Sequence, residues 1–270
     1  MKSLNGVAVA ALIAAVGAPA AFAQEAVQWR IEDGGNGHWY RLQPLSQPAR
    51  WSDARQVAQA LGADLASLES VGEPEFVYVI AGNPAGWGSR VGPWLGGFQD
   101  TAANDYVEPA GGWRWVSGAP WSFTSWGPGE PNNSPAPENF LHLISNQCPG
   151  YPEGRFYNDV RGEFAEFGSC DKMPISAIIE WSADCNGDGI VDYGQILLGE
   201  LVDANANGIP DTCECIADVN EDGVVNGADI SVLLGYWGLS GKNVVGDLTG
   251  DGTVNGADLS VLLGSWGPCK

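Results

Sequence analysis

Five oxygen-bearing side chains near the middle of the chain have the types and spacing of a Ca²⁺ site. They are Glu130, Asn132, Glu138, Asn158 and Asp159. Ca²⁺ is a hard cation that takes about six to eight oxygen ligands, carboxylates and amide carbonyls alike. If the five side chains converge, open coordination positions remain for two neighbouring hydroxyls, whose protons the carboxylates can accept.

A second set of oxygen ligands occurs twice near the C-terminus. A Ca²⁺ loop of about twelve residues places oxygens at positions 1, 3, 5, 7, 9 and 12 and a glycine at position 6. The first loop supplies Asp218, Asn220, Asp222, the Val224 carbonyl, Asn226 and Asp229, with Gly223 at the turn. The second supplies Asp247, Thr249, Asp251, the Thr253 carbonyl, Asn255 and Asp258, with Gly252. Near-identical apolar segments follow both loops, which indicates an internal repeat.

A looser version of this pattern lies between the two regions. One stretch contains Asp184, Asn186, Asp188, Gly189 and Asp192, and the next contains Asp203, Asn205, Asn207, Gly208 and Asp211. The spacing favours a spacer stiffened by metal. A flexible linker remains the alternative.

Charge and composition exclude other functions. The formal net charge of −21 would repel nucleic acid. The only histidines, His38 and His142, have no obvious nucleophile beside them, and no pair of acids outside the metal motifs has a clear role. We therefore expect no enzyme.

The first residues predict export. Lys2 precedes an apolar run from Val7 to Val16, and Ala21-Phe22-Ala23 fits a cleavage site. This is the pattern of a secretory signal peptide over residues 1–23. The run is short for a membrane span, and no later segment is apolar enough to be one. We expect a secreted, extracellular protein without a membrane span, and association with a cell surface is left open.

The elements that must position the first ligand set lie in residues 24–182. A strand is expected at 38–42 and a helix at 51–61, capped by Ser52 and ended by Gly62. A second helix begins at Glu73-Pro74, and short strands follow near 93–98, 113–115, 141–144 and 177–181. Helices followed by irregular strands predict an α+β domain, with a long loop at 125–139. The inward residues expected are Ala54, Val57, Ala58 and Leu61 on the first helix, and Phe76, Val77 and Ile80 on the second.

Six cysteines allow 15 pairings, and the sequence alone does not choose among them. Position favours Cys148–Cys170, Cys185–Cys213 and Cys215–Cys269. Exchange between Cys213 and Cys215, and a tether formed at Cys269, remain open.

The first region resembles the C-type lectin-like fold over essentially its whole length. The resemblance rests on Trp94-Leu95-Gly96-Gly97, Trp113-Arg114-Trp115, Glu130-Pro131-Asn132, Tyr157-Asn158-Asp159 and Ile179-Glu180-Trp181. It implies a cis Glu130-Pro131 bond and one Ca²⁺ held by the five ligands named first. Glu130, Asn132, Glu138 and Asn158 would also bind the sugar. Glu-Pro-Asn implies mannose-type glycans, including glucose and N-acetylglucosamine, whereas Gln-Pro-Asp would imply galactose. Ala58 and Ile179 replace two cysteines usual in the family, and an apolar contact could replace their bridge.

The other two regions also resemble known families. The C-terminal repeat resembles dockerin type I, whose EF-hand-like loops each lead into one helix. This implies a small all-α module over 216–270, with Val232, Leu233 and Leu234 in its core. Dockerins dock onto cohesins through hydroxyl residues at positions 10 and 11. Gly227-Ala228 and Gly256-Ala257 stand there instead, so a cohesin-like or cell-envelope partner is expected rather than a standard cohesin. Residues 183–215 resemble thrombospondin type 3-like Ca²⁺ repeats.

Together these features predict a secreted, Ca²⁺-dependent carbohydrate-binding protein with a tethering module. Two alternatives remain open: a non-catalytic adhesion or scaffold protein that uses Ca²⁺ only for structure, and an accessory subunit of polysaccharide degradation. Binding to glycans that a chelator abolishes would separate the first prediction from the scaffold.

Overall fold

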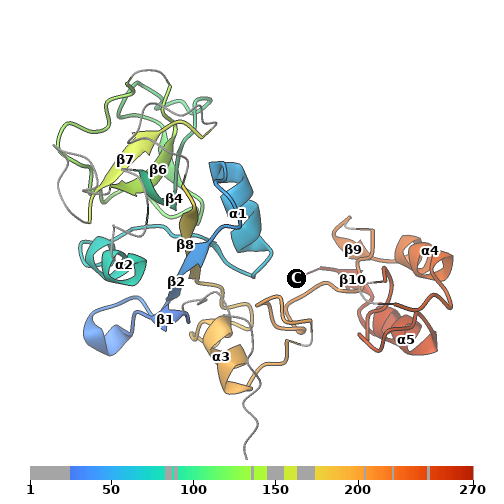
Figure 1. Cartoon of the computed structure of the whole chain (residues 1–270). Helices are drawn as coiled ribbons and strands as arrows, with labels where there is room; N and C mark the ends of the chain where they lie inside the picture. Colours follow the sequence, from blue (N-terminus) through green and yellow to red (C-terminus); the bar gives the residue numbers. More distant parts are fainter. Residues whose placement is uncertain are drawn as a thin grey trace, which may run out of the picture.

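The computed structural model describes residues 25–82, 87, 91–134, 137–144, 155–162, 174–203, 205–220, 222–241 and 244–269. Figure 1 shows an N-terminal mixed domain, the segment that carries α3, and the C-terminal pair of helices. The predicted signal peptide (1–23) and the predicted Cys148–Cys170 bridge lie outside the described residues.

The N-terminal domain is built on one mixed sheet with two helices against it. The sheet order is β1-β2-β8-β4-β6-β7, with β3 paired to β8 and β5 to β4. β2 and β8 pair antiparallel from Trp39↔Trp181 to Pro44↔Ser176, so the two ends of the domain meet. This confirms the expected α+β class. The elements are β1 (Val27–Gln28), a 3₁₀ turn (Ile31–Asp33), β2 (Trp39–Pro44), α1 (Trp51–Gln59), β3 (Asp64–Leu65), α2 (Glu73–Ala81), β4 (Val91–Gln99), β5 (Trp113–Trp115), β6 (Phe140–Ile144), β7 (Tyr157–Val160) and β8 (Ser176–Trp181).

Helix α1 differs from the prediction at its start and on one face. It begins at Trp51 with Arg50 at the N-cap position and no side-chain cap, so the expected Ser52 cap is wrong. The Trp51 indole donates to the carbonyl of Leu95 at 2.7 Å, and this contact fixes the start of the helix instead. Val57 is 39% exposed, because the helix rests on the sheet through Ala54 and Ala58. Helix α2 buries Val77 and Ile80 as expected, and Phe76 packs at the edge of the core.

Two apolar clusters form the core of this domain. Ala58 and Ile179 are both fully buried in the cluster that also contains Trp51 and Trp94. The positions at which cysteines were expected from the family thus belong to one apolar cluster. The second cluster contains Tyr40, Trp113, Trp115 and Tyr157 and lies under the long loops.

A buried polar network explains His38. Its Nδ1 lies 2.5 Å from Glu180 Oε1, and the Tyr40 hydroxyl donates to Glu73 at 2.6 Å and to Glu180 at 3.1 Å. Burial raises the pKa of Glu73 to about 7. These contacts join β2, α2 and β8, so His38 has a structural partner.

The C-terminal repeat forms a small module around two helices. α4 (Gly227–Gly235) and α5 (Gly256–Gly264) follow the two loops, and the short strands β9 (Val224–Val225) and β10 (Gly267–Pro268) pair beside them. Leu234 is 52% exposed and Val232 is only partly buried and outside the core cluster, so the predicted place of these two residues in the core is wrong. Leu233 precedes Leu234 by about 100° around the helix and takes the inward position. The fully buried residues are Ala217, Val225, Leu233, Val254 and Leu262.

The middle segment contains a helix that the sequence did not predict, α3 (Asp192–Leu198). The predicted bridges Cys185–Cys213 and Cys215–Cys269 are both present. Among the described residues, no helix combines the length and the apolarity needed to cross a bilayer.

Candidate functional site

The loop that carries Glu130 and Asn132 is held by Asp159 of β7. The backbone N–H groups of Asn132 and Asn133 donate to the Asp159 carboxylate at 3.2 and 2.9 Å. Asn133 has a φ of 52°, and its side chain accepts from the Glu138 N–H at 2.9 Å. The Glu130-Pro131 peptide is cis, as expected from the family. Asp159 therefore ties both ends of the predicted ligand set together.

Glu130 and Asn132 lie beside each other on this loop. The side-chain amide of Asn132 donates to Glu130 Oε2. Three residues of the predicted set are thus linked by contacts: Glu130 to Asn132, and Asn132 to Asp159.

Asn158 presents a buried, unpartnered oxygen. It lies opposite His142 in the β6–β7 ladder, and its Nδ2 is 3.5 Å from His142 Nε2. The side chain is 8% exposed, and Oδ1 has no hydrogen-bond partner. A buried amide oxygen without a partner is costly and calls for a ligand. His142 was expected to be an ordinary strand residue, and no sequence signal indicated that it contacts the side-chain amide of Asn158.

Glu138 is buried close to two other acids, Asp159 and Glu130. Burial, followed by the charges of Asp159 and Glu130, raises the pKa of Glu138 to about 8. Burial also raises the pKa of Asp159. An opposite charge would relieve both effects, which fits a cation at this site.

The acids of this loop are neighbours without forming a closed cage. No three acid oxygens from Glu130, Glu138 and Asp159 lie within 4.8 Å of one another. Hydrogen bonds and charge interactions link Glu130, Asn132, Glu138 and Asp159, and Asn158 precedes Asp159 on β7. The number and type of the five residues fit Ca²⁺.

Aromatic rings pack against the start of the loop that carries Glu130 and Asn132. The Trp126 ring lies 5.0 Å from Trp113 and 4.8 Å from Tyr157, and the Tyr157 hydroxyl accepts from the Ser125 N–H at 2.6 Å. Tyr157 is fully buried. These rings pack the base of the loop.

The C-terminal loops have the hydrogen bonds of a preformed Ca²⁺ loop. In the first, Asp218 accepts from Asp222 N and Gly223 N at 3.0 and 2.7 Å, and Asn220 accepts from Asp222 N at 3.0 Å. Asp229 is fully buried and accepts from Asn220 N and Asn226 N at 3.2 and 2.8 Å. Asp229 is therefore buried beneath the loop, whereas Asp222 stays exposed.

The second C-terminal loop repeats the arrangement. Asp247 accepts from Gly252 N at 2.9 Å, and Asp258 accepts from Thr249 N and Asn255 N at 2.9 and 2.7 Å. Asp247 Oδ1 is buried and has no partner. The donor set fits Ca²⁺ in both loops.

The middle segment contains two more loops of this kind. Asp184 accepts from Asp188 N and Gly189 N at 3.1 and 2.8 Å, as Asp218 does from Asp222 N and Gly223 N. Asp203 accepts from Asn207 N and Gly208 N at 3.1 and 2.9 Å. Counting from these first positions, position 12 is Gln195 in one loop and Glu214 in the other, two residues that the sequence analysis missed.

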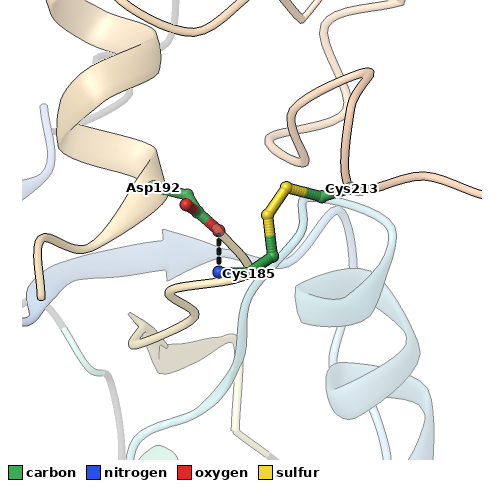
Figure 2. Close-up of side chains that lie close together, drawn as sticks. All are labelled: Cys185, Asp192 and Cys213. Carbon is green, nitrogen blue, oxygen red and sulfur yellow. Dashed lines mark hydrogen bonds between the residues drawn. A yellow bond between two sulfur atoms is a disulfide. The ribbon is translucent and has the colours of Figure 1, made fainter. Parts of the chain in front are cut away.

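Asp192 lies beside a disulfide in this segment. Figure 2 shows one oxygen of Asp192 accepting from the Cys185 N–H, at 2.9 Å, while the other points away from the Cys185–Cys213 bridge. Burial raises the pKa of Asp192, and the charges of Asp184 and Asp188 raise it further. Disulfide sulfur is no thiolate, so these residues do not form a zinc site.

We call the loop at 125–139, which carries Glu130 and Asn132, the sugar loop. A cavity of about 320 Å³ lies away from this loop. Its walls include Asp64, Trp181, Asp192, Tyr193 and Pro210, from the N-terminal domain and the middle segment. Sugar chelation by a loop-bound metal needs open coordination positions rather than a cavity, so we assign the cavity no part in it.

Comparison with known proteins supports the two predicted domains. Residues 216–263 match the family model of the dockerin type I domain. The chain is 36% identical to ladderlectin of Oncorhynchus mykiss over 84 residues, which are 31% of this chain and 40% of ladderlectin. It is 27% identical over 136 residues to C-type lectin domain family 17, member A of Homo sapiens, covering 50% of this chain and 30% of the human protein. The chain thus spans well under half the length of these relatives.

Solved structures of similar shape include human lithostathine. It superposes with a TM-score of 0.42 at 21% sequence identity, covering 58% of this chain and 97% of lithostathine. The resemblance of the two terminal regions to C-type lectins and dockerins is confirmed by the sequence matches. The resemblance of residues 183–215 to thrombospondin repeats, and the domain limits at 23, 182 and 215, remain predictions.

Proposed function

We propose that this chain is a secreted, Ca²⁺-dependent carbohydrate-binding protein whose C-terminal module attaches it to a partner. The observation that carries the proposal is the buried, unpartnered Oδ1 of Asn158, the residue before Asp159 on β7, whose charge helps to raise the pKa of the buried Glu138. Homology to C-type lectins over the N-terminal region and the dockerin match at 216–263 support the pairing of functions.

Each residue of the loop has a distinct part in binding. Asn158 offers its free oxygen, and Asp159 holds the backbone of Asn132 and Asn133 in place. Bound Ca²⁺ supplies a Lewis acid for two neighbouring sugar hydroxyls. Glu130 and Glu138 would accept hydrogen bonds from those hydroxyls, and the amides of Asn132 and Asn158 would donate hydrogen bonds to their oxygens.

We further propose mannose-type glycans, including glucose and N-acetylglucosamine, as ligands. The order Glu130-Pro131-Asn132 places the acceptor before the donor, and reversing that order would reverse the pattern offered to the sugar. A single site of this kind binds at about millimolar Kd, or about −4 kcal/mol, so repeated display on a surface would be needed.

The C-terminal module is proposed to tether the lectin to a cohesin-like or cell-envelope partner. Positions 10 and 11 of the two loops, Gly227-Ala228 and Gly256-Ala257, carry no hydroxyl for a standard cohesin. We also infer that the protein is not an enzyme, since His38 and His142 both have structural partners.

Calorimetry of the mature protein with mannose and galactose tests the proposal. Mannose should bind in Ca²⁺ and fail to bind with chelator, and Glu138→Gln should abolish binding. Glu200→Gln, the same change on an exposed acid of the middle segment, is the matched control. The double variant Glu130→Gln, Asn132→Asp should shift preference to galactose. A folded protein that binds Ca²⁺ but no glycan on an array would instead support the scaffold alternative.

A further inference from the structure

Two buried carboxylates of the N-terminal domain meet at one tyrosine hydroxyl. Tyr40 Oη of β2 lies 2.6 Å from Glu73 Oε1 of α2 and 3.1 Å from Glu180 Oε1 of β8. All three residues are buried, and His38 Nδ1 lies 2.5 Å from the same oxygen of Glu180. We call these four side chains, Tyr40, Glu73, Glu180 and His38, the Tyr40 network. The network joins three elements that are far apart in the sequence.

A count of donors gives the number of protons that these contacts need. A tyrosine hydroxyl donates one hydrogen bond and accepts two, so Tyr40 cannot donate to both acids at once. Asn36 Nδ2 donates to Tyr40 Oη at 2.7 Å and fills one of the two acceptor positions. If Tyr40 donates to Glu180, its contact with Glu73 is a hydrogen bond only when Glu73 carries a proton and donates it. With both carboxylates ionised, one contact would bring two acceptors together. One added proton therefore satisfies every contact.

The hydrogen bonds around the two acids favour this proton on Glu73. Glu180 accepts from the Ser67 N–H at 2.9 Å through Oε2 and lies beside His38 through Oε1. Both of its oxygens therefore face donors, which favours the ionised form. The Oε2 atom of Glu73 accepts from the backbone N–H groups of residues 69 and 70, at 2.6 and 3.2 Å. Its Oε1 atom, which faces Tyr40, is thus left to carry the proton.

The charges in and around the network act in the same direction. Burial raises the pKa of Glu73 to about 7, and the charges of Glu180 and Glu69 add to this effect. Burial lowers the pKa of His38, but the hydrogen bond to Glu180 and the charges of Glu180, Glu73 and Glu69 raise it overall. The His38 side chain is 26% exposed, so the network has contact with solvent.

We propose that the Tyr40 network is a pH-sensitive switch, in which one proton on Glu73 completes a chain of hydrogen bonds that holds α2 and β2 to β8. In this chain Glu73 donates to Tyr40, Tyr40 donates to Glu180, and His38 donates to the same carboxylate. Loss of the proton leaves two ionised acids at one hydroxyl, so α2 and the β1–β2 hairpin open more often. The switch does not rest on the function proposed above.

The direction of the pH dependence follows from the two shifts. Because the pKa of Glu73 is raised from 4.5, the stability that its proton contributes is fully present below pH 4.5 and is lost as pH rises through about 7. The raised pKa of His38 has the same sign, so its contribution is fully present below pH 6.5 and is lost at higher pH. Mild acid therefore keeps the network intact, and mild alkali weakens it.

Hydrogen exchange of the full chain tests the switch. It is measured in Ca²⁺, so that the pH dependence expected of metal-free Glu138 does not contribute. Glu73→Gln keeps the shape of the acid and offers an N–H donor to Tyr40 at every pH. The ratio of exchange rates in α2 and β2, wild type over Glu73→Gln, should be about tenfold or more higher at pH 8 than at pH 5. Comparing the two proteins at one pH cancels the intrinsic exchange rate.

Glu75→Gln, which changes an exposed acid of the same helix, is the matched control. Its ratio to the wild type should be the same at pH 5 and pH 8. A ratio for Glu73→Gln that is equally independent of pH would overturn the switch.

NMR titration of the wild type keeps the test independent of how the variant folds. The side-chain carboxyl carbon of Glu73, assigned by its absence from the spectrum of Glu73→Gln, should titrate near pH 7, while Glu180 stays ionised from pH 5 to pH 8. A Glu73 that is ionised over this whole range, or a Glu180 that titrates in its place, would overturn the proposal. Glycan binding is not a readout here, so a failure at the sugar loop leaves the result unchanged.

Discussion

At the scale of single residues, we expect Glu138 to link Ca²⁺ binding to pH. Its pKa rises from 4.5 to about 8 because it is buried beside Asp159 and Glu130. Without metal, the stability contributed by protonated Glu138 is fully present below the unfolded pKa and is lost as pH rises through about 8. A cation must displace this proton, so Ca²⁺ affinity at the sugar loop should rise between about pH 6 and pH 8.

Calorimetry in two buffers of different ionisation enthalpy measures the proton that Ca²⁺ releases. Glu138→Gln should release none at this site and should flatten the pH dependence of the metal-free melting temperature. Equal proton release by the two proteins would refute the assignment of the shift to Glu138.

We expect His142 to position the side chain of Asn158. Its Nε2 lies 3.5 Å from Asn158 Nδ2, on the side opposite the free oxygen. Partners that orient a metal ligand are worth about 10–100-fold in metal affinity. His142→Phe should therefore weaken Ca²⁺ at the sugar loop by about 10-fold or more, as measured by titration followed through mannose binding. The two C-terminal loops in the same chain serve as the internal control, and an equal loss there would indicate general misfolding.

At the scale of elements, we predict that two neighbouring leucines near the end of α4 contribute very differently to the stability of the C-terminal module. Leu233 is fully buried and Leu234 is 52% exposed. Leu233→Ala should destabilise the C-terminal module by about 2–5 kcal/mol, because it leaves a cavity in a small core. Leu234→Ala should cost less than about 0.5 kcal/mol. Urea unfolding in saturating Ca²⁺ checks both values, and similar losses would contradict the observed orientation of the helix.

Some elements of the fold could be predicted from the sequence and others could not. The strands around Trp94, Trp113 and Ile179 and the loop acids could be predicted, because apolar runs and fixed ligand spacing are local properties. The start of α1 could not, since the Trp51 contact with Leu95 is tertiary. Helix α3 was missed because its apolar residues Leu197 and Leu198 are exposed and its buried members include Asp192 and Gln195. The pairing of His142 with Asn158 across β6 and β7 depends on strand register, which could not be predicted from the sequence.

At the scale of the whole molecule, many of the acids that make the chain strongly anionic are also predicted to bind Ca²⁺. The formal net charge is −21, and many of its acids stand in the loops from Asp184 onward. Close carboxylates repel one another until a cation neutralises them. The C-terminal module has a small buried core to oppose that repulsion, whereas the N-terminal domain has two apolar clusters. Ca²⁺ should therefore stabilise the C-terminal module far more than the core of the N-terminal domain.

Differential scanning calorimetry of the full chain tests this difference. With chelator present, the C-terminal module should melt in a separate transition at a lower temperature than the N-terminal domain. Ca²⁺ at 100 times its Kd should stabilise the module by about 2.7 kcal/mol per site. Asp229→Asn should remove the part of that shift contributed by the first loop, about half of it, because Asp229 is fully buried at position 12 of that loop. The N-terminal transition, in which Trp94 and Ile179 are buried, should move much less. Simple screening would act through ionic strength, so NaCl at matched ionic strength is the control. If NaCl reproduced the shift, charge screening rather than bound Ca²⁺ would hold the module together.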